Sequence, residues 1–233
     1  GGGYFSRANI EMTDRLNMLV GSQITEEYCF SFGLFYSTSS LLDLVSKNLP
    51  NGHQIRAVLT PNYSNWMSVL FSKYESYLDN IKLQNLILPG AHDAGMYTDS
   101  ILVQISLFAK TQLDDTMKQL QMGARIFDIR PGYTPLNDIR HLHGSDVAQG
   151  EYYKVMLEQI TQFLAKNEQE IVVIHLCDDG IPNKDVSIPK PGILEKMANE
   201  VAINHGIKIG NKSSLGKSIQ ALFAANERLV IVS

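Results

Sequence analysis

Cysteine is scarce in this chain of 233 residues, which contains only Cys29 and Cys177. Two cysteines cannot build a scaffold of several disulfides, although one long-range disulfide stays open. Cys177 lies in an apolar run, where a buried free thiol is the expected state. The cysteine content therefore excludes a small disulfide-rich fold and favours a reducing compartment.

The chain also lacks any block of basic residues. It has 20 Lys and Arg residues against 24 Asp and Glu residues, which gives a formal net charge of −4. Sequence-independent binding to nucleic acid requires a basic face that neutralises phosphates. The charge balance therefore predicts no nucleic-acid partner, while transient contact with a membrane surface stays open.

No apolar run approaches the ~18 residues of a transmembrane helix. The first three residues, all glycine, show neither the charged and apolar segments of a signal peptide nor an initiator methionine. We therefore expect the sequence to start after a processing point, a joint or a further segment. It predicts a soluble protein in peripheral contact with a membrane, and it leaves cytoplasmic and secreted locations open.

The composition that is present is ordinary for a globular protein, with 44% hydrophobic and 19% charged residues. The length suggests one large domain, or one domain with an appendage. A complete (β/α)₈ barrel typically takes ~250 residues. A chain of 233 residues with an additional N-terminal region is therefore short for a full barrel.

Residues 1–60 predict a small N-terminal appendage that is β-rich or mixed. Strands are expected at 28–36, where small and aromatic residues alternate, and at 54–60. A leucine-rich stretch between them, residues 41–45, predicts a short helix that ends at Asn48, before a Pro-Asn-Gly turn. No residue in this region suggests a chemical role.

Residues 61–233 predict alternating strands and helices. The expected strands lie at 83–88, 124–129, 140–143, 171–176 and 229–232. The expected helices lie at 114–122, 151–166, 191–204 and 215–225. Strands that are apolar throughout and alternate with helices indicate a parallel α/β sheet or barrel, buried on both faces.

Titratable residues follow the expected strands. In α/β barrels the catalytic residues lie at the C-terminal ends of the strands. The residues at these positions are His92 and Asp93, Asp128 and Arg130, His141 and His143, and His175, Asp178 and Asp179. Several such residues together are more informative than any one of them.

These residue types suit the cleavage of a phosphodiester without a metal ion. Two histidines can serve as general base and general acid near neutral pH. An arginine offers a bidentate fork for a phosphate, and carboxylates can orient the imidazoles or the guanidinium.

Other interpretations of the same residues stay open. His141 and His175 could be structural histidines, and Asp128 with Arg130 could form only an ion pair. Asp93 could cap a turn or a helix. The carboxylates and histidines could also bind a metal ion, although Arg130 at the centre would repel it.

In order along the chain, several segments resemble the X domain of phosphatidylinositol-specific phospholipase C. The most specific are Pro-Gly-Ala-His-Asp at 89–93, Gly-Ala-Arg-Ile-Phe-Asp-Ile-Arg at 123–130, and His-Gly at 143–144. Weaker matches include Asn-Trp-Met-Ser at 65–68, Glu-Ile-Val-Val-Ile at 170–174 and Arg-Leu-Val-Ile-Val at 228–232. The resemblance covers about residues 65–233. It implies a TIM-barrel-like X domain at 61–233, of which this chain holds the first half.

The resemblance also implies a role for each site residue. His92 is the general base for the inositol 2-hydroxyl, and His143 is the general acid for the departing diacylglycerol oxygen. Arg130 holds the phosphate, Asp93 assists the acid, and Asp128 supports the site. The implied products are diacylglycerol and a cyclic inositol phosphate. No cofactor is expected, because the carboxylates of the calcium-dependent relatives are replaced here.

The sequence departs from the family at Cys177, Asp178 and Asp179, where bacterial relatives carry a lysine. It also contains no candidate for the aspartate that orients the base histidine in those relatives. We therefore expect another segment to complete the barrel, and headgroup specificity does not transfer. Two alternatives are a catalytically weak module that binds lipid or protein, and a metal-dependent enzyme of the glycerophosphodiesterase type.

Overall fold

A computed structural model describes residues 5–7, 28–35, 45–48, 54–61, 63–97, 110–144, 148–179, 181, 183–190 and 192–233. The chain divides into two compact units, residues 1–63 and 64–233. Each unit is described by itself below. No helix in the described part of the chain is both long and apolar enough to span a bilayer.

The first unit contains a four-stranded antiparallel sheet. Its strands are β1 (Phe5–Arg7), β2 (Tyr28–Phe35), β3 (Val45–Asn48) and β4 (Gln54–Pro61), in the order β1-β2-β4-β3. The strands predicted at 28–36 and 54–60 are confirmed. The helix predicted to end at Asn48 is wrong, because Val45–Asn48 pairs with β4 instead. A helix this short has too few hydrogen bonds to offset the cost of its nucleation, whereas pairing with β4 satisfies the backbone of these residues. Residues 41–44 lie outside the described residues.

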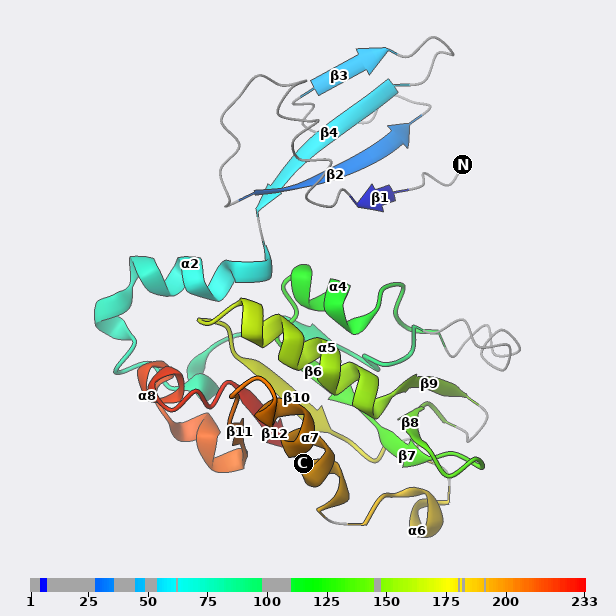
Figure 1. The fold of residues 1–233 in the computed structure, drawn as a ribbon. Helices are drawn as coiled ribbons and strands as arrows, with labels where there is room; N and C mark the ends of the chain where they lie inside the picture. Colours follow the sequence, from blue (N-terminus) through cyan, green and yellow to red (C-terminus); the bar gives the residue numbers. More distant parts are fainter. Residues whose placement is uncertain are drawn as a thin grey trace. The chain divides into compact units, whose positions relative to one another are not determined.

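The second unit is built on a parallel sheet of five strands (Figure 1). The strands are β5 (Gly90–Ala91), β6 (Ile126–Ile129), β10 (Val172–Leu176), β11 (Ile209–Gly210) and β12 (Leu229–Val232). Their order across the sheet is β11-β12-β10-β6-β5. All four neighbouring pairs run parallel, so the C-terminal ends of the strands share one edge of the sheet.

One face of this sheet is covered by helices α4 (Thr116–Gln121), α5 (Tyr153–Lys166) and α7 (Ile193–Ile203), with α5 between the other two. The core under α5 joins Leu157 and Ile160 of the helix to Phe127 and Ile174 of the sheet, all fully buried. Alternation along β6 turns Phe127 and Ile129 toward the helices and leaves Asp128 for the opposite face. The helices predicted at 114–122, 151–166 and 191–204 are confirmed.

The other face of the sheet carries a second core. It is formed by helix α2 (Trp66–Lys73), helix α8 (Ile219–Ala224) and two 3₁₀ segments, η3 (Leu83–Asn85) and η4 (Lys212–Gly216). Met67 and Phe71 of α2 pack with Val173 and Val230 of the sheet. Two further 3₁₀ segments, η1 (Tyr63–Asn65) and η2 (Glu75–Tyr77), flank α2.

Two expected elements of the second unit are corrected in this region of the chain, and one element was not expected. The strand predicted at 83–88 is wrong, because Leu83 is buried in a 3₁₀ turn and pairing with β6 begins only at Gly90. The helix predicted at 215–225 begins only at Ile219, after η4. Helix α6 (Lys184–Ser187) was not predicted.

A further correction concerns the strand predicted at 140–143. It exists as β8 (Ile139–Leu142), but it does not join the parallel sheet. It lies in a separate antiparallel sheet between β7 (Pro131–Tyr133) and β9 (Gln149–Tyr152). β7 follows β6 after a single residue, Arg130, so this small sheet extends from the C-terminal edge of the large one.

Candidate active site

The five predicted site residues meet at the C-terminal edge of the parallel sheet. His92 and Asp93 follow β5, Asp128 and Arg130 stand at the end of β6, and His143 follows β8. Ion-pair distances link all five side chains into one cluster. The antiparallel sheet thus places His143 next to the residues at the end of the parallel sheet.

The Asp93 carboxylate lies at the centre of the cluster and is fully buried. Its Oδ1 is 3.0 Å from Arg130 Nε and 3.4 Å from His141 Nε2. Its Oδ2 is 3.1 Å from His143 Nε2 and 3.3 Å from His92 Nδ1. One carboxylate therefore contacts four basic side chains, two at each oxygen.

The backbone around Asp93 takes a left-handed conformation, with φ 47°. Aspartate tolerates this region better than most residues. The Asp93 N–H donates to Asp128 Oδ2 at 3.1 Å, and the next N–H, of Ala94, donates to the Asp128 carbonyl at 2.9 Å. Asp128 thus stabilises the backbone turn that directs the Asp93 side chain into the site.

The surroundings of Asp93 favour its ionised form. Burial by itself raises the pKa of this carboxyl, but the hydrogen bond from His141 and the nearby charges of Arg130 and His143 outweigh it. The net effect lowers the pKa of Asp93 below its ordinary value. The site therefore holds a fixed negative charge at neutral pH.

The ring of His92 lies at the surface, with 73% of its side chain exposed. Its Nε2 is hydrogen-bonded to the guanidinium of Arg130 at 3.2 Å. Because a guanidinium can only donate, Nε2 must accept and carries no proton. The proton of the neutral ring is then on Nδ1, which faces Asp93.

Arg130 is held at both its side chain and its backbone. Its guanidinium donates to Asp128 Oδ2 at 3.2 Å, in addition to its contacts with Asp93 and His92. Its carbonyl accepts from the N–H of Leu142 at 2.9 Å, and its own N–H donates to His141 Nδ1 at 3.3 Å. Both backbone bonds come from β8, so the antiparallel sheet sets the position of the arginine.

Three of these residues could also hold a metal ion. His92, Asp93 and Asp128 each offer a ligand atom, and these atoms lie within 4.8 Å of one another. The guanidinium of Arg130, however, contacts a carboxylate oxygen of both aspartates. A divalent cation held by these carboxylates would lie close to the guanidinium and would be repelled by its positive charge.

Residues at the end of β10 are placed around the same edge but outside the cluster. His175 is exposed and pairs in register with Asp128 of β6. Asp178 binds Lys184 Nζ at 3.0 Å, and both side chains are about half exposed. Cys177 is a free thiol that is only partly buried, which corrects the expectation of a buried one.

The sequence did not indicate that His141 belongs to this cluster, because a structural role for it stayed open. It is fully buried and hydrogen-bonded to Asp93 and to Arg130. One signal for it is present in the sequence. Residues two apart on a strand face the same side, so His141 follows His143 toward the site.

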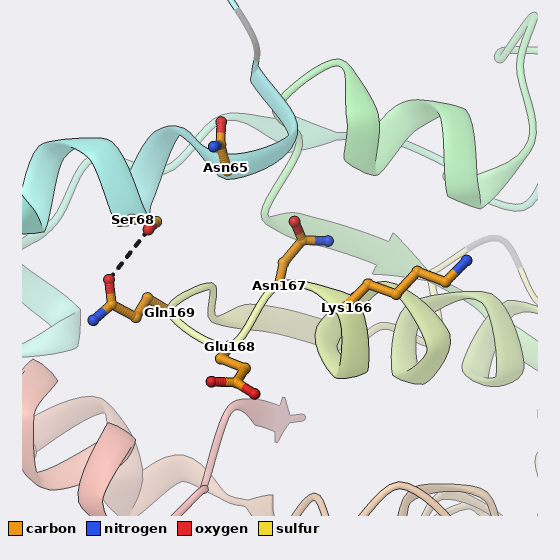
Figure 2. A pocket seen from close by; sticks show the side chains of 6 residues that line it. All are labelled: Asn65, Ser68, Lys166, Asn167, Glu168 and Gln169. Atoms are coloured by element: carbon orange, nitrogen blue, oxygen red, sulfur yellow. Dashed lines mark hydrogen bonds between the residues drawn. The ribbon is translucent and has the colours of Figure 1, made fainter. Parts of the chain in front are cut away.

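A separate open pocket lies at the opposite edge of the second unit (Figure 2). It is lined by polar side chains around the start of α2 and the loop from α5 to β10: Asn65, Ser68, Lys166, Asn167, Glu168 and Gln169. The Ser68 hydroxyl donates to Gln169 Oε1 at 3.1 Å across it. This loop enters β10 at its N-terminal end, so the pocket does not include the candidate active site.

Comparison with known proteins finds similarity over the central part of the chain. Residues 89–190 match the family model of the phosphatidylinositol-specific phospholipase C X domain. A 1-phosphatidylinositol phosphodiesterase of Staphylococcus aureus is 32% identical over 121 residues, which cover 52% of this chain and 36% of that protein. A protein of the same name from Listeria monocytogenes is 31% identical over 115 residues, covering 49% of this chain and 32% of its own length. The chain thus spans about a third of the length of these relatives.

A solved structure supports the same assignment at the level of the fold. Phosphatidylinositol-specific phospholipase C of S. aureus aligns with a TM-score of 0.55 at 22% identity, covering 74% of this chain and 52% of that one. The TIM-barrel-like α/β fold predicted from the sequence is confirmed. The resemblance to the X-domain family is confirmed as well, over residues 89–190.

Proposed function

We propose that this chain, whose residues 89–190 match the X domain, cleaves the phosphodiester of a phosphatidylinositol-type lipid without a metal ion. One observation carries the proposal: an arginine and two histidines surround a single buried aspartate at the C-terminal edge of the sheet. A phosphate ligand, a base and an acid are the groups that this reaction requires. The names of the bacterial relatives, both 1-phosphatidylinositol phosphodiesterases, support the substrate class.

The first half of the proposed reaction uses His92 and Arg130. A bound phosphate attracts the Arg130 guanidinium, which releases the unprotonated Nε2 of His92 from their hydrogen bond. His92 Nε2 then takes the proton of the inositol 2-hydroxyl, and the hydroxyl oxygen attacks phosphorus within the same molecule. Asp93 at Nδ1 stabilises the imidazolium that forms. Asp128 supports the arginine through its contact at 3.2 Å.

The second half uses His143 as the general acid. In its protonated form it is stabilised by Asp93 Oδ2, 3.1 Å from its Nε2. As the bond between phosphorus and the diacylglycerol oxygen breaks, His143 gives its proton to that oxygen. The products are diacylglycerol and a cyclic inositol phosphate. One carboxylate oxygen, Asp93 Oδ2, thus faces both the proposed base and the proposed acid.

The position of Arg130 supports the absence of a metal from this mechanism. In a metal-dependent phosphodiesterase, a divalent cation would neutralise the phosphate from between the carboxylates. Here the arginine fork already contacts Asp93 and Asp128 and supplies the positive charge. We therefore propose that no cofactor is needed.

Two exposed leucines support a substrate that lies in a membrane surface. Leu113, in the segment after β5, is 91% exposed, and Leu136, in the turn between β7 and β8, is 83% exposed. Both belong to loops that leave the sheet on the side of the candidate active site. Exposed apolar side chains around a site fit a partner with an apolar surface. The proposed partner is therefore the headgroup of a phospholipid in a bilayer.

The test of this function is turnover of phosphatidylinositol in vesicles by the chain. We expect a cyclic inositol phosphate as the first product, detected by ³¹P NMR, at a rate that excess EDTA leaves unchanged. His92→Ala should lower kcat/KM by about a thousandfold, since it removes the base. His205→Ala, which changes an exposed histidine outside the candidate active site, is the matched control and should have no effect.

The possible results separate the alternatives. Loss of all activity in EDTA would replace this mechanism with a metal-dependent one. Binding to the vesicles without turnover would indicate a lipid-binding module instead of an enzyme. Full activity of His92→Ala would show that the base is another residue.

Arg130→Lys tests the phosphate-binding role. Lysine keeps the positive charge but cannot form two parallel hydrogen bonds with the phosphate or contact Asp93 and Asp128 together. We expect kcat/KM to fall by about a hundredfold or more, measured on the same vesicles. Lys184→Arg, at an exposed cation on the same edge of the sheet, is the control. A value for Arg130→Lys within tenfold of the parent would contradict the role.

A further inference from the structure

His141 has no part in the proton transfers proposed above, yet it is fully buried behind the residues that do. It makes two hydrogen bonds, one at each ring nitrogen. Nδ1 is 3.3 Å from the backbone nitrogen of Arg130, and Nε2 is 3.4 Å from Asp93 Oδ1. The ring therefore bridges the proposed phosphate ligand and the central carboxylate.

These two partners determine where the proton of the His141 ring lies. A backbone N–H can only donate, so the Nδ1 that faces Arg130 must accept. In the neutral ring the proton is then on Nε2, where it is donated to the carboxylate of Asp93. His141 thus provides Asp93 with a donor that carries no charge.

The neutral form is also the one that the surroundings favour. A second proton would have to go on Nδ1, directly against the Arg130 N–H. The charged groups that face the ring are Asp93, Asp128 and Arg130. Burial lowers the pKa of His141 more strongly than its contacts with the two aspartates raise it.

Packing also restricts the His141 side chain. Gly95 lies against it so closely that a Cβ at position 95 would stand 2.5 Å from the His141 Cβ and 2.9 Å from its Cγ. On the other side, β8 holds the backbone of His141 opposite Pro131. The orientation of the Nε2–H toward Asp93 is therefore imposed by packing as well as by hydrogen bonding.

We propose that His141 is a positioning residue, a neutral donor that fixes Asp93 Oδ1 and the Arg130 backbone so that Asp93 Oδ2 faces His92 and His143. The proposal rests on the function proposed above, since it assigns how the same site is ordered. Oδ1 is hydrogen-bonded to His141 and ion-paired with Arg130, and these two contacts oppose rotation of the carboxylate. Its second oxygen then faces the two histidines. Catalytic geometry that is off by about 1 Å can cost a hundredfold in rate.

Two substitutions separate the two hydrogen bonds of His141. In His141→Gln the side-chain amide nitrogen reaches about as far as Nε2 and can still donate to Asp93. In His141→Asn the amide oxygen lies near the position of Nδ1 and can still accept from the Arg130 N–H, but the shorter side chain has no donor that reaches Asp93. We expect His141→Gln to keep kcat within about tenfold of the parent and His141→Asn to lose about a hundredfold, with KM little changed in both.

The pH profile distinguishes positioning from a purely structural role. Without the His141 hydrogen bond at Oδ1, Asp93 should take up a proton more readily. The acid side of the kcat/KM profile should then move to higher pH in His141→Asn and stay in place in His141→Gln. Thermal unfolding of both variants reports their stability. The proposal would be overturned if both variants lost kcat equally, in proportion to their loss in melting temperature, and if the pH profile of kcat/KM did not move.

A second measurement does not depend on activity. In the chain with ¹⁵N-labelled histidine, the imidazole shifts of His141 should show a neutral ring with its proton on Nε2 from about pH 5 to 8. A charged ring, or a proton on Nδ1, would overturn the proposal even if the enzyme turns over. If the ring is neutral with its proton on Nε2 but the chain shows no turnover, the placement of His141 is supported and the proposed function is rejected.

Discussion

Replacing Asp93 with asparagine is expected to lower kcat/KM on phosphatidylinositol vesicles by about a thousandfold or more. The carboxylate faces His92 and His143 at Oδ2 and pairs with Arg130 at Oδ1. An amide has no charge to stabilise either imidazolium, and its NH₂ group would meet donors on one side. The loss of a carboxylate that orients a catalytic histidine has effects of this size in other hydrolases.

Asp178→Asn is the matched control for this change. Asp178 lies at the same edge of the sheet, but it is exposed and pairs only with Lys184 among the described residues. We expect its kcat/KM to stay within about twofold of the parent, since exposed pairs contribute little. Activity of Asp93→Asn within tenfold of the parent would show that the carboxylate is not central to the reaction.

The same variant should change how stability depends on pH. The pKa of Asp93 is lower in the folded protein than its ordinary value, so ionised Asp93 stabilises the fold. That stabilisation is present in full above about pH 4, the ordinary range of an aspartate, and is lost as the pH falls through the depressed value. Melting temperatures of parent and Asp93→Asn should therefore differ most near neutral pH and converge in acid. A constant difference across this range would contradict the assignment.

Glu170→Ala is expected to destabilise the second unit by about 3–5 kcal/mol, because it leaves the charge of Arg125 buried without its partner. Both side chains are fully buried, and Arg125 lies 2.8 Å and 2.7 Å from Glu170 Oε2 through Nε and Nη2. Glu170 Oε1 accepts from the N–H of Ser68 at 2.9 Å, at the start of α2. The pair therefore ties α2 to β6 and β10.

The attraction between Glu170 and Arg125 offsets only part of the cost of burying their two charges. Burial raises the pKa of Glu170 more than the charge of Arg125 lowers it, and burial lowers the pKa of Arg125. Further contacts hold the guanidinium: it donates to the carbonyls of Leu120 and Ser64, both at 2.9 Å, and lies 4.7 Å from the Phe163 ring centre. A buried ion pair of this kind is costly to break from one side and can be replaced as a whole.

Urea unfolding measures this prediction. The double variant Arg125→Met with Glu170→Leu should recover much of the stability that Glu170→Ala loses, since it removes both charges. Glu200→Ala, which breaks an exposed pair with Lys196, is the control and should cost less than about 1 kcal/mol. A loss below about 1 kcal/mol for Glu170→Ala would show that the pair does not hold the unit together.

Much of the fold could be predicted because its signals are local. The apolar run at 171–176 and the helical spacing at 151–166 each identify an element without knowledge of the rest of the chain, and both are confirmed. The failures lie where tertiary pairing overrides local preference. Residues 83–88 look like a strand, but the backbone turns, so that Leu83, Leu86 and Leu88 pack into the second core while Ile87 is exposed. β8 has the sequence of a strand, and only its partners decide that it lies outside the parallel sheet.

The sequence by itself indicated which residues make up the candidate site. It placed His92, Asp93, Asp128, Arg130 and His143 at the ends of expected strands, because strand ends and motif spacing are properties of the chain order. Only the tertiary structure decided that Asp93 contacts four basic groups and that His141 is buried between Asp93 and Arg130. The physical reason is that hydrogen-bond partners, burial and ring tautomers depend on atoms from β5, β6 and β8 together, which are separated by up to about fifty residues of sequence.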